Sequence, residues 1–188
     1  MEEPIINIQN VVATASLGQK FDLRSILQTI PGVEYRPEQF PGLVYRLKKP
    51  KTATLIFSSG KMVCTGAKSE RQSRKAVMKV VEDLKKSGIV INGRPEIQTQ
   101  NIVASAGLGG TIDLEKTTYS LEKTMYEPEQ FPGLIYRMND PKVVFLLFTS
   151  GNLVITGAKK EEEVYRAVTI LKKTLEEKEL IHYQKRPK

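Results

Sequence analysis

The chain has 188 residues, with 29 lysines and arginines against 21 aspartates and glutamates, a formal net charge of +8 and a pI of about 9.5. A chain of this length can bury a sizeable core, and its basic balance favours an anionic partner. No apolar run approaches the ~18 residues of a membrane span, and no residue spacing indicates a metal site, a cofactor or a catalytic group. We therefore expect a soluble intracellular protein with no membrane contact and no small-molecule substrate.

Two residue types occur once each and exclude further chemistry. Cys64 cannot form an internal disulfide, and it lies in an apolar segment where we expect it to be buried as a small hydrophobe. His182 is the one residue available for imidazole chemistry, and we expect it in a frayed, solvated tail.

The first half of the chain alternates between strand-like and helix-like periodicity. Pro31-Gly32 stops a short helix, and Ser69 begins a longer one, where it forms a capping box with Gln72. The elements predicted in chain order are a strand at 5–15, a helix at 21–30, strands at 43–47, 52–58 and 61–65 with a hairpin turn at 58–61, and a helix from Ser69 with apolar positions 76, 77, 80, 81 and 84.

The second half repeats this order at a constant offset of 91 residues. Ten of the twelve residues at 35–46 recur at 126–137, all except Arg36 and Val44, and Thr65-Gly66-Ala67-Lys68 recurs as Thr156-Gly157-Ala158-Lys159. The elements predicted in the copy are strands at 97–106, 134–138, 143–149 and 152–156, a helix at 112–121, and a helix with apolar positions 164, 167, 168, 171 and 175.

A repeat of this length is too long for a solenoid and predicts two copies of one unit in a pseudo-two-fold body. The predicted domains are residues 1–91, with a core at 10–86, and residues 92–188, with a core at 101–177. A linker is expected at 88–94. Such a body suits a partner with approximate two-fold symmetry, and duplex DNA is the commonest such partner.

The two halves differ in charge. Residues 1–91 carry 15 Lys and Arg against 8 Asp and Glu, whereas residues 92–188 carry 14 against 13. The pseudo-symmetry is therefore broken electrostatically.

The predicted strands are apolar on both faces. At 52–58 one face carries Ala53, Leu55 and Phe57, while Ile56 makes the other face apolar too. Two helices per half can cover only one face of such a sheet. The second face is then either an open binding surface or the contact between two sheets packed face to face.

Three segments make the chain resemble the TATA-box-binding protein family over nearly its whole length. They are Gln9-Asn10-Val11-Val12-Ala13 with its copy Gln100-Asn101-Ile102-Val103-Ala104, the stretch 131–138 (Phe-Pro-Gly-Leu-Ile-Tyr-Arg-Met), and the stretch 57–68 (Phe-Ser-Ser-Gly-Lys-Met-Val-Cys-Thr-Gly-Ala-Lys). The resemblance implies an α+β fold in which two pseudo-symmetric repeats form one curved ten-stranded antiparallel sheet, a saddle with four main helices on its convex face. It also implies a transcription initiation factor that binds the minor groove of the TATA box and is not an enzyme.

The resemblance assigns four phenylalanines as wedges that insert between base steps, as members of this family do. They are Phe40, Phe57, Phe131 and Phe148. Each pair is 17 residues apart, and the first member lies between prolines in a Pro-Glu-Gln-Phe-Pro-Gly loop, called a stirrup below. An arbitrary phenylalanine is more often a core residue.

Base readout is expected from paired positions near the pseudo-dyad. Asparagine amides can donate to adenine N3 or thymine O2, and valine methyl groups disfavour the guanine amino group. The expected residues are Asn10, Asn101, Val12, Val103, Val63, Val154, Thr65 and Thr156, with Leu55, Leu146, Pro41 and Pro132 beside the wedges. A lone strand asparagine is otherwise an edge or turn residue.

Phosphate or sugar contacts are expected from a second set of positions, which orient the protein without reading sequence. They are Arg46, Arg137, Ser59, Ser150, Lys61, Lys68 and Lys159. The copy has Asn152 where the first half has Lys61, so one contact is expected to be missing there.

The second stirrup is expected to dock transcription factor B through Glu127 and Glu129, and the assembly is expected to recruit RNA polymerase. The stirrup sequence is similar to archaeal members, which implies a cytoplasmic, nucleoid-associated protein; a eukaryotic member would be nuclear. The competing hypothesis is an enzyme or ligand-binding protein on a duplicated helix-on-sheet scaffold, similar to the half-fold of some DNA glycosylases. Such an enzyme needs a poised acid, base or nucleophile on the open face.

Overall fold

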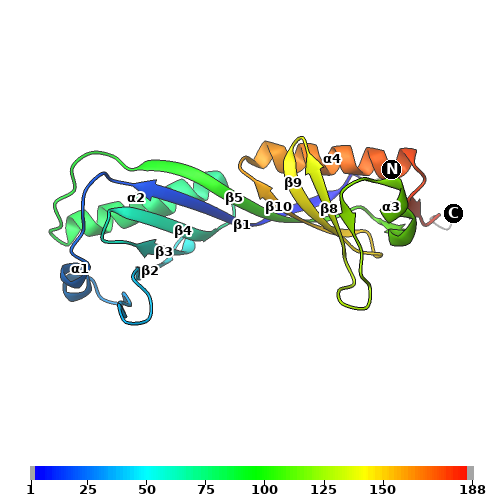
Figure 1. The fold of residues 1–188 in the computed structure, drawn as a ribbon. Helices are drawn as coiled ribbons and strands as arrows, with labels where there is room; N and C mark the ends of the chain where they lie inside the picture. Colours follow the sequence, from blue (N-terminus) through cyan, green and yellow to red (C-terminus); the bar gives the residue numbers. More distant parts are fainter. Residues whose placement is uncertain (1–2, 186–188) are drawn as a thin grey trace. The chain divides into compact units, whose positions relative to one another are not determined.

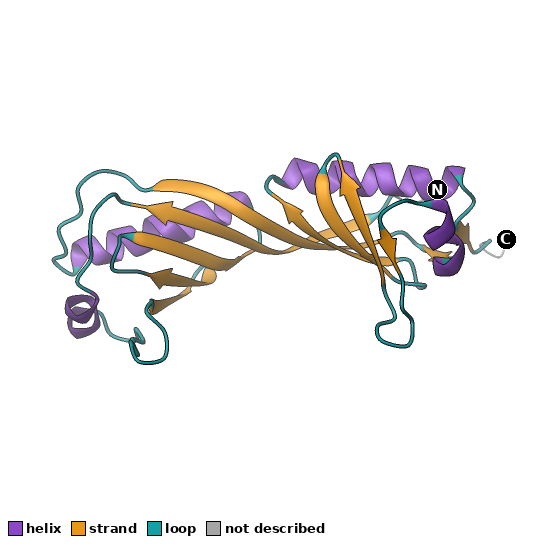
Figure 2. Ribbon diagram, in the orientation of Figure 1, coloured by secondary structure: helices purple, strands orange, loops and turns teal. Residues whose placement is uncertain are grey.

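The computed structural model describes residues 3–185 and has an α+β fold (Figures 1 and 2). Nine strands follow the order β2-β3-β4-β1-β5-β10-β9-β8-β7, and β11 pairs with β6 in a small separate sheet. The elements are β1 (Ile5–Ser16), α1 (Leu23–Thr29), β2 (Leu43–Lys48), β3 (Lys51–Ile56), β4 (Lys61–Ala67), α2 (Glu70–Lys86), β5 (Glu96–Gly107), β6 (Gly110–Ile112), α3 (Leu114–Ser120), β7 (Thr124–Met125), β8 (Leu134–Asn139), β9 (Lys142–Leu147), β10 (Asn152–Ala158), α4 (Glu161–Glu177) and β11 (Ile181–Tyr183).

Every strand and helix predicted from periodicity is present, with ends that differ by at most two residues. The predicted cap of the longer helix is confirmed, because the Ser69 hydroxyl accepts a hydrogen bond from the Gln72 N–H at 2.9 Å. The Gln72 side-chain oxygen accepts in turn from the Lys68 N–H at 2.6 Å, one residue before the cap. These two bonds fix where α2 leaves β4.

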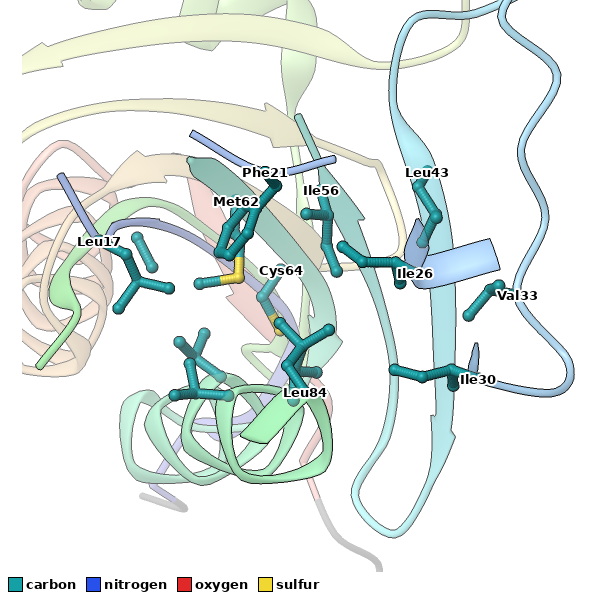
Figure 3. Close-up of a cluster of buried hydrophobic side chains, with 14 of the residues drawn as sticks. Leu17, Phe21, Ile26, Ile30, Val33, Leu43, Ile56, Met62, Cys64 and Leu84 are labelled. Atoms are coloured by element: carbon teal, nitrogen blue, oxygen red, sulfur yellow. The ribbon is translucent and has the colours of Figure 1, made fainter. Parts of the chain in front are cut away.

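The core of the first repeat lies between α2 and one face of the strands (Figure 3). The apolar stripe of α2 is fully buried, and it packs with inward side chains such as Ile56, Met62 and Cys64. Cys64 is buried as predicted, and burial raises the pKa of its thiol. Figure 2 shows α2 and α4 each running along one side of the strands in its own part of the chain.

The described chain separates into two compact units. One is Asn10–Asn101, and the other combines the segment before Asn10 with the segment from Ile102 onward. The first nine residues therefore pack with the second repeat: the Gln9 amide donates to the Ser105 hydroxyl at 2.9 Å. The compact units therefore differ from the domains predicted from the sequence repeat, 1–91 and 92–188. The outer ends of those predicted domains, residues 1–2 and 186–188, lie outside the described residues.

The large sheet has nine strands instead of the ten expected. The position equivalent to β7 in the first repeat is reduced to a single bridge between Glu34 and Val44. Val33, the residue before this bridge, is buried in the core beside Ile30 (Figure 3). Strands from both repeats form this one nine-stranded sheet, so the alternative in which each half has its own sheet and the two pack face to face is wrong.

The expectation of a frayed tail around His182 is wrong, because residues 181–183 form β11 against β6. Leu180 and Ile181 are buried, and the Tyr183 hydroxyl donates to the Glu176 carboxylate at 2.7 Å. The buried apolar side chains and this hydrogen bond hold the strand in place. The His182 side chain is exposed, as expected.

Candidate nucleic-acid interface

One face of the strands in each compact unit is only half-buried. Along β3 the side chains of Thr52, Thr54 and Ile56 are buried, whereas those of Ala53 and Leu55 are partly exposed. The strand β9 shows the same alternation. The prediction of a second, open sheet face is therefore confirmed within each unit.

Strand register arranges this open face into rows of side chains. In the first repeat Val44 lies opposite Leu55, Leu55 opposite Val63, and Val63 opposite Thr14. The corresponding row in the second repeat is Ile135, Leu146, Val154 and Ser105. The next rows are Arg46, Ala53 and Thr65 in the first repeat and Arg137, Val144 and Thr156 in the second. Six of the predicted readout residues thus lie in matched rows: Leu55, Leu146, Val63, Val154, Thr65 and Thr156. Val12 and Val103 are partly exposed on β1 and β5.

Asn10 is held in one orientation by its neighbours on β4. Its side-chain oxygen accepts a hydrogen bond from the Gly66 N–H at 2.7 Å, and its amide nitrogen donates to the Thr65 hydroxyl at 3.1 Å. A backbone N–H can only donate, so this contact identifies the amide oxygen. The amide nitrogen keeps a second hydrogen for a partner on the open face.

Gly66 makes this arrangement possible. The register between β1 and β4 shifts by one residue between Val11 and Ala13, and Gly66 has a φ of +100° in the strand opposite. A positive φ at a bulge favours glycine. Gly157 repeats the conformation at +99° beside the register shift of β10. Asn101, the counterpart of Asn10, is half-buried and ends the first compact unit.

The predicted wedges form two close aromatic pairs. Phe40 and Phe57 meet edge to face with ring centroids 5.9 Å apart and planes at 68°. Phe131 and Phe148 repeat the contact at 6.0 Å and 73°. Phe40 and Phe131 are 40% and 42% exposed, so these rings belong to the surface and not to the core. Pro41 and Pro132, which follow them in the stirrups, are also exposed.

A glycine makes room for each aromatic pair. A Cβ at Gly42 would come within 2.7 Å of the Phe40 ring and 3.0 Å of the Phe57 ring. At Gly133 the distances are 2.7 Å to Phe131 and 3.1 Å to Phe148. No role was predicted for these glycines from the sequence. Their position two residues after the stirrup phenylalanine, in both copies, is the signal that could have identified them.

The residues predicted to contact phosphate are exposed on the outer parts of the strands and turns. They are Arg46, Arg137, Ser59, Ser150, Lys61, Lys68 and Lys159. Arg46 forms an ion pair with Glu34 at 3.1 Å, with both side chains more than half exposed. Such an exposed pair contributes little stability. Asn152, the counterpart of Lys61, is exposed and uncharged.

The two acidic residues of the second stirrup are exposed as well. Glu127 and Glu129 lie in the loop between β7 and β8, which extends away from the strands (Figure 1). The loop is held from inside, because the Glu127 carbonyl accepts hydrogen bonds from the N–H groups of Gln130 and Phe131, both at 3.0 Å. Glu127 and Glu129 therefore lie in a hydrogen-bonded turn.

The open faces carry apolar, amide and hydroxyl side chains, a surface typical of a protein that binds a groove and unsuited to proton transfer. Within residues 3–185, no group of three His, Cys, Asp or Glu side chains could hold a metal ion. The described helices include none long and apolar enough to cross a membrane. Fold and face together define a DNA-binding protein that uses a β-sheet.

Comparison with known proteins gives the family. The family model described as transcription factor TFIID (or TATA-binding protein, TBP) matches twice, at residues 5–87 and 96–178. The chain is similar to the TATA-box-binding protein of Pyrodictium occultum, with 63% identity over 88% of this chain and 83% of that protein. The corresponding protein of Methanothermobacter thermautotrophicus is 51% identical over 96% of this chain and all of its own length. The solved structure of Methanococcus jannaschii TBP aligns with a TM-score of 0.83 and 49% identity, over 92% of this chain and 98% of that one.

The chain therefore belongs to the TATA-binding protein family, in its archaeal branch. This is a family of DNA-binding transcription factors, so the enzyme hypothesis is wrong.

Proposed function

We propose that this protein starts transcription at A·T-rich promoters by binding the minor groove of the TATA box, kinking the DNA with two phenylalanine pairs, and recruiting transcription factor B and RNA polymerase. The two edge-to-face pairs, each beside a glycine that leaves space for it, carry this proposal. Its site of action is then the archaeal nucleoid.

The phenylalanine pairs are suited to opening a base step. Burying a phenylalanine removes ~150–250 Å² from water, which at ~25 cal/mol/Å² gains roughly 4–6 kcal/mol. Two rings can thus offset an unstacking cost of a few kcal/mol. Because the rings already touch each other in the free protein, little side-chain ordering is needed when they insert.

Readout of A·T pairs follows from the fixed Asn10 amide and the valine methyl groups. The free N–H of Asn10 can donate to adenine N3 or thymine O2, the acceptors that A·T pairs present in the minor groove. Val12 and Val63 are partly exposed on the same face, where the amino group of guanine would lose its hydrogen bond to water. Asn101, Val103 and Val154 are proposed to do the same in the second repeat.

Phosphate contacts are proposed for the exposed cations and hydroxyls on the outer strands. Arg46 and Arg137 occupy matched register positions opposite Ala53 and Val144, so each repeat presents one guanidinium beside its open face. These groups displace counterions and fix the position of the duplex without reading its sequence.

Recruitment of transcription factor B is proposed to use Glu127 and Glu129. The matched positions in the first stirrup are Arg36 and Glu38, so only the second stirrup presents two carboxylates. This difference gives a partner a means to distinguish the two repeats. RNA polymerase would join through that assembly.

A binding assay with two duplexes tests the DNA-binding proposal. One duplex carries a TATA-like box, and the other has the same length with the box scrambled to G·C pairs. We expect the protein to bind the TATA duplex at least ~1,000-fold more tightly at physiological salt, the lower end of the specificity typical of DNA-binding proteins. Equal affinity for the two duplexes would contradict the proposal.

A further inference from the structure

A shallow pocket of about 660 Å³ lies between the turn that joins β2 to β3 and the first turns of α2. Its lining consists of Lys48, Lys49, Pro50, Lys51, Ser69, Arg71, Gln72 and Lys75. Five of these eight residues are cationic and none is acidic. We call this the basic pocket; it contains none of the residues to which a DNA contact was assigned above.

The five cations of the basic pocket are not neutralised by the protein. Their side chains are exposed, and none of them forms an ion pair with another residue of the described chain, 3–185. The two polar residues of the lining are already engaged, because Ser69 and Gln72 cap α2. The start of this 17-residue helix adds the partial positive charge of its N-terminus.

The second repeat shows what the same position looks like when it is neutralised. At the offset of 91 residues, Lys49 corresponds to Asp140 and Lys75 to Arg166. Arg166 and Asp140 form an ion pair with a nitrogen to oxygen distance of 3.3 Å. The second copy thus supplies its own carboxylate to the helix cation, whereas the first copy has a lysine there.

The neighbouring helix positions follow the same trend. Arg71 and Gln72 correspond to Glu162 and Glu163 in the first turn of α4. Much of the charge difference between the two halves of the chain is therefore concentrated at this one place.

We propose that the basic pocket docks an acidic segment of a partner protein, with a carboxylate of that segment taking the place against Lys75 that Asp140 has against Arg166. The second repeat shows that the fold accommodates a carboxylate at this position, which favours an acidic peptide over the phosphates of a nucleic acid. This interaction is separate from TATA binding and would mark the first repeat for a second partner. The docking depends on the cluster of unpaired cations in the basic pocket, which the second repeat does not have at the matched positions.

Fluorescence anisotropy with the full chain tests the proposal. The probe is a fluorescein-labelled nine-residue peptide, (Asp-Glu-Gly) repeated three times, measured at low salt. We expect Lys49→Asp and Arg71→Glu, which introduce a carboxylate where the second repeat has one, each to weaken peptide binding by at least about fivefold. Asp140→Lys should strengthen it, because it opens the matched position in the second repeat.

The matched control is Lys20→Asp, the same charge change at an exposed position outside the pocket, which should alter peptide binding by less than about twofold. Binding of the TATA duplex by Lys49→Asp separates this proposal from the DNA-binding proposal, and we expect it to be unchanged. Equal losses in Lys49→Asp and Lys20→Asp would overturn the basic pocket as a site. The proposal would also be overturned if a duplex without a TATA box bound more tightly than the peptide and lost affinity in the same variants. The pocket would then bind nucleic acid.

Discussion

Phe40 and Phe57 meet edge to face, 5.9 Å between ring centroids, across the space that Gly42 leaves. One ring comes from a stirrup and the other follows a strand, so the pair is assembled by the fold. Its duplicate, Phe131 with Phe148, has nearly the same distance. We infer that the free protein already holds the rings proposed as wedges in position.

Replacing the glycine beside a wedge should disturb the wedge more than the fold. In Gly42→Ala the new methyl group would lie 2.7 Å from the Phe40 ring, which can swing aside because it is partly exposed. We expect a roughly tenfold loss of TATA affinity, about 1.4 kcal/mol, with a small change in thermal stability. Titration of a TATA duplex and a thermal melt measure the two effects. The control is Gln39→Ala in the same stirrup, and a loss of the same size in the control would remove the role assigned to Gly42.

Sequence readout and phosphate binding should be separable. Asn10→Ala should lower the affinity for TATA sites by about 1–3 kcal/mol and leave binding to a G·C duplex nearly unchanged. Lys68→Ala should weaken both duplexes equally and reduce the slope of log affinity against log salt by about 1. Titrations of both duplexes at several salt concentrations give these values. If the two variants lose affinity in the same pattern, the assignment of their roles is wrong.

Tyr45 links stability to alkaline pH in the first repeat. Its hydroxyl donates to the Asp83 carboxylate at 2.6 Å, and burial together with this contact raises the pKa of Tyr45 to about 12. Because the folded pKa lies above the ordinary value of 10, the stabilisation is complete below pH 10 and is lost as the pH rises toward 12. Tyr45→Phe should cost about 1 kcal/mol at neutral pH and should flatten the decline of stability above pH 10.

Denaturant melts between pH 8 and 12 measure this effect. The control is Tyr136→Phe: Tyr136 stacks on Phe145, burial alone raises the pKa of its hydroxyl, and Thr174 stands where the first repeat has Asp83, so we expect a smaller alkaline change in this variant. The same alkaline change in both variants would show that the contact with Asp83 is not responsible.

Charge at the second stirrup should affect the partner and not the DNA. Reversing both carboxylates, Glu127→Lys with Glu129→Lys, should leave TATA binding largely intact and prevent the ternary complex with transcription factor B. Glu38→Lys in the first stirrup is the matched control and should leave that complex unchanged. A gel-shift titration with transcription factor B distinguishes the complexes. Normal ternary assembly on the doubly reversed variant would place the docking surface elsewhere.

Most of the fold could be predicted because its strands and long helices are periodic and occur twice. The strands β6, β7 and β11 could not, since two or three residues are too few to show a period. The Glu34 bridge and the strand at Ile181 depend on tertiary packing at the sheet edge and at the chain end. Local sequence contains neither kind of information.

The residues proposed for the candidate site could be selected from the sequence, but the contacts that support them could not. Paired phenylalanines and asparagines are visible in the sequence, whereas the closeness of Gly42 to Phe57 appears only when a stirrup and a strand end are brought together. The bulge at Gly66 likewise depends on a register shift between β1 and β4. The ion pair between Arg166 and Asp140, which the matched residues of the first repeat do not form, could likewise be identified only from the structure.

Kinking by the phenylalanine pairs is tested most directly by the bend angle of the bound DNA. Energy transfer between dyes at the two ends of a TATA duplex reports this angle for the unmodified protein and for Phe57→Ala and Phe148→Ala. We expect a bent duplex with the unmodified protein and a clearly smaller bend, together with weaker binding, in each variant, because the wedge stabilises the kinked state and contributes little to contact with straight DNA. A bend that is the same in all three complexes would contradict the role of these residues as wedges.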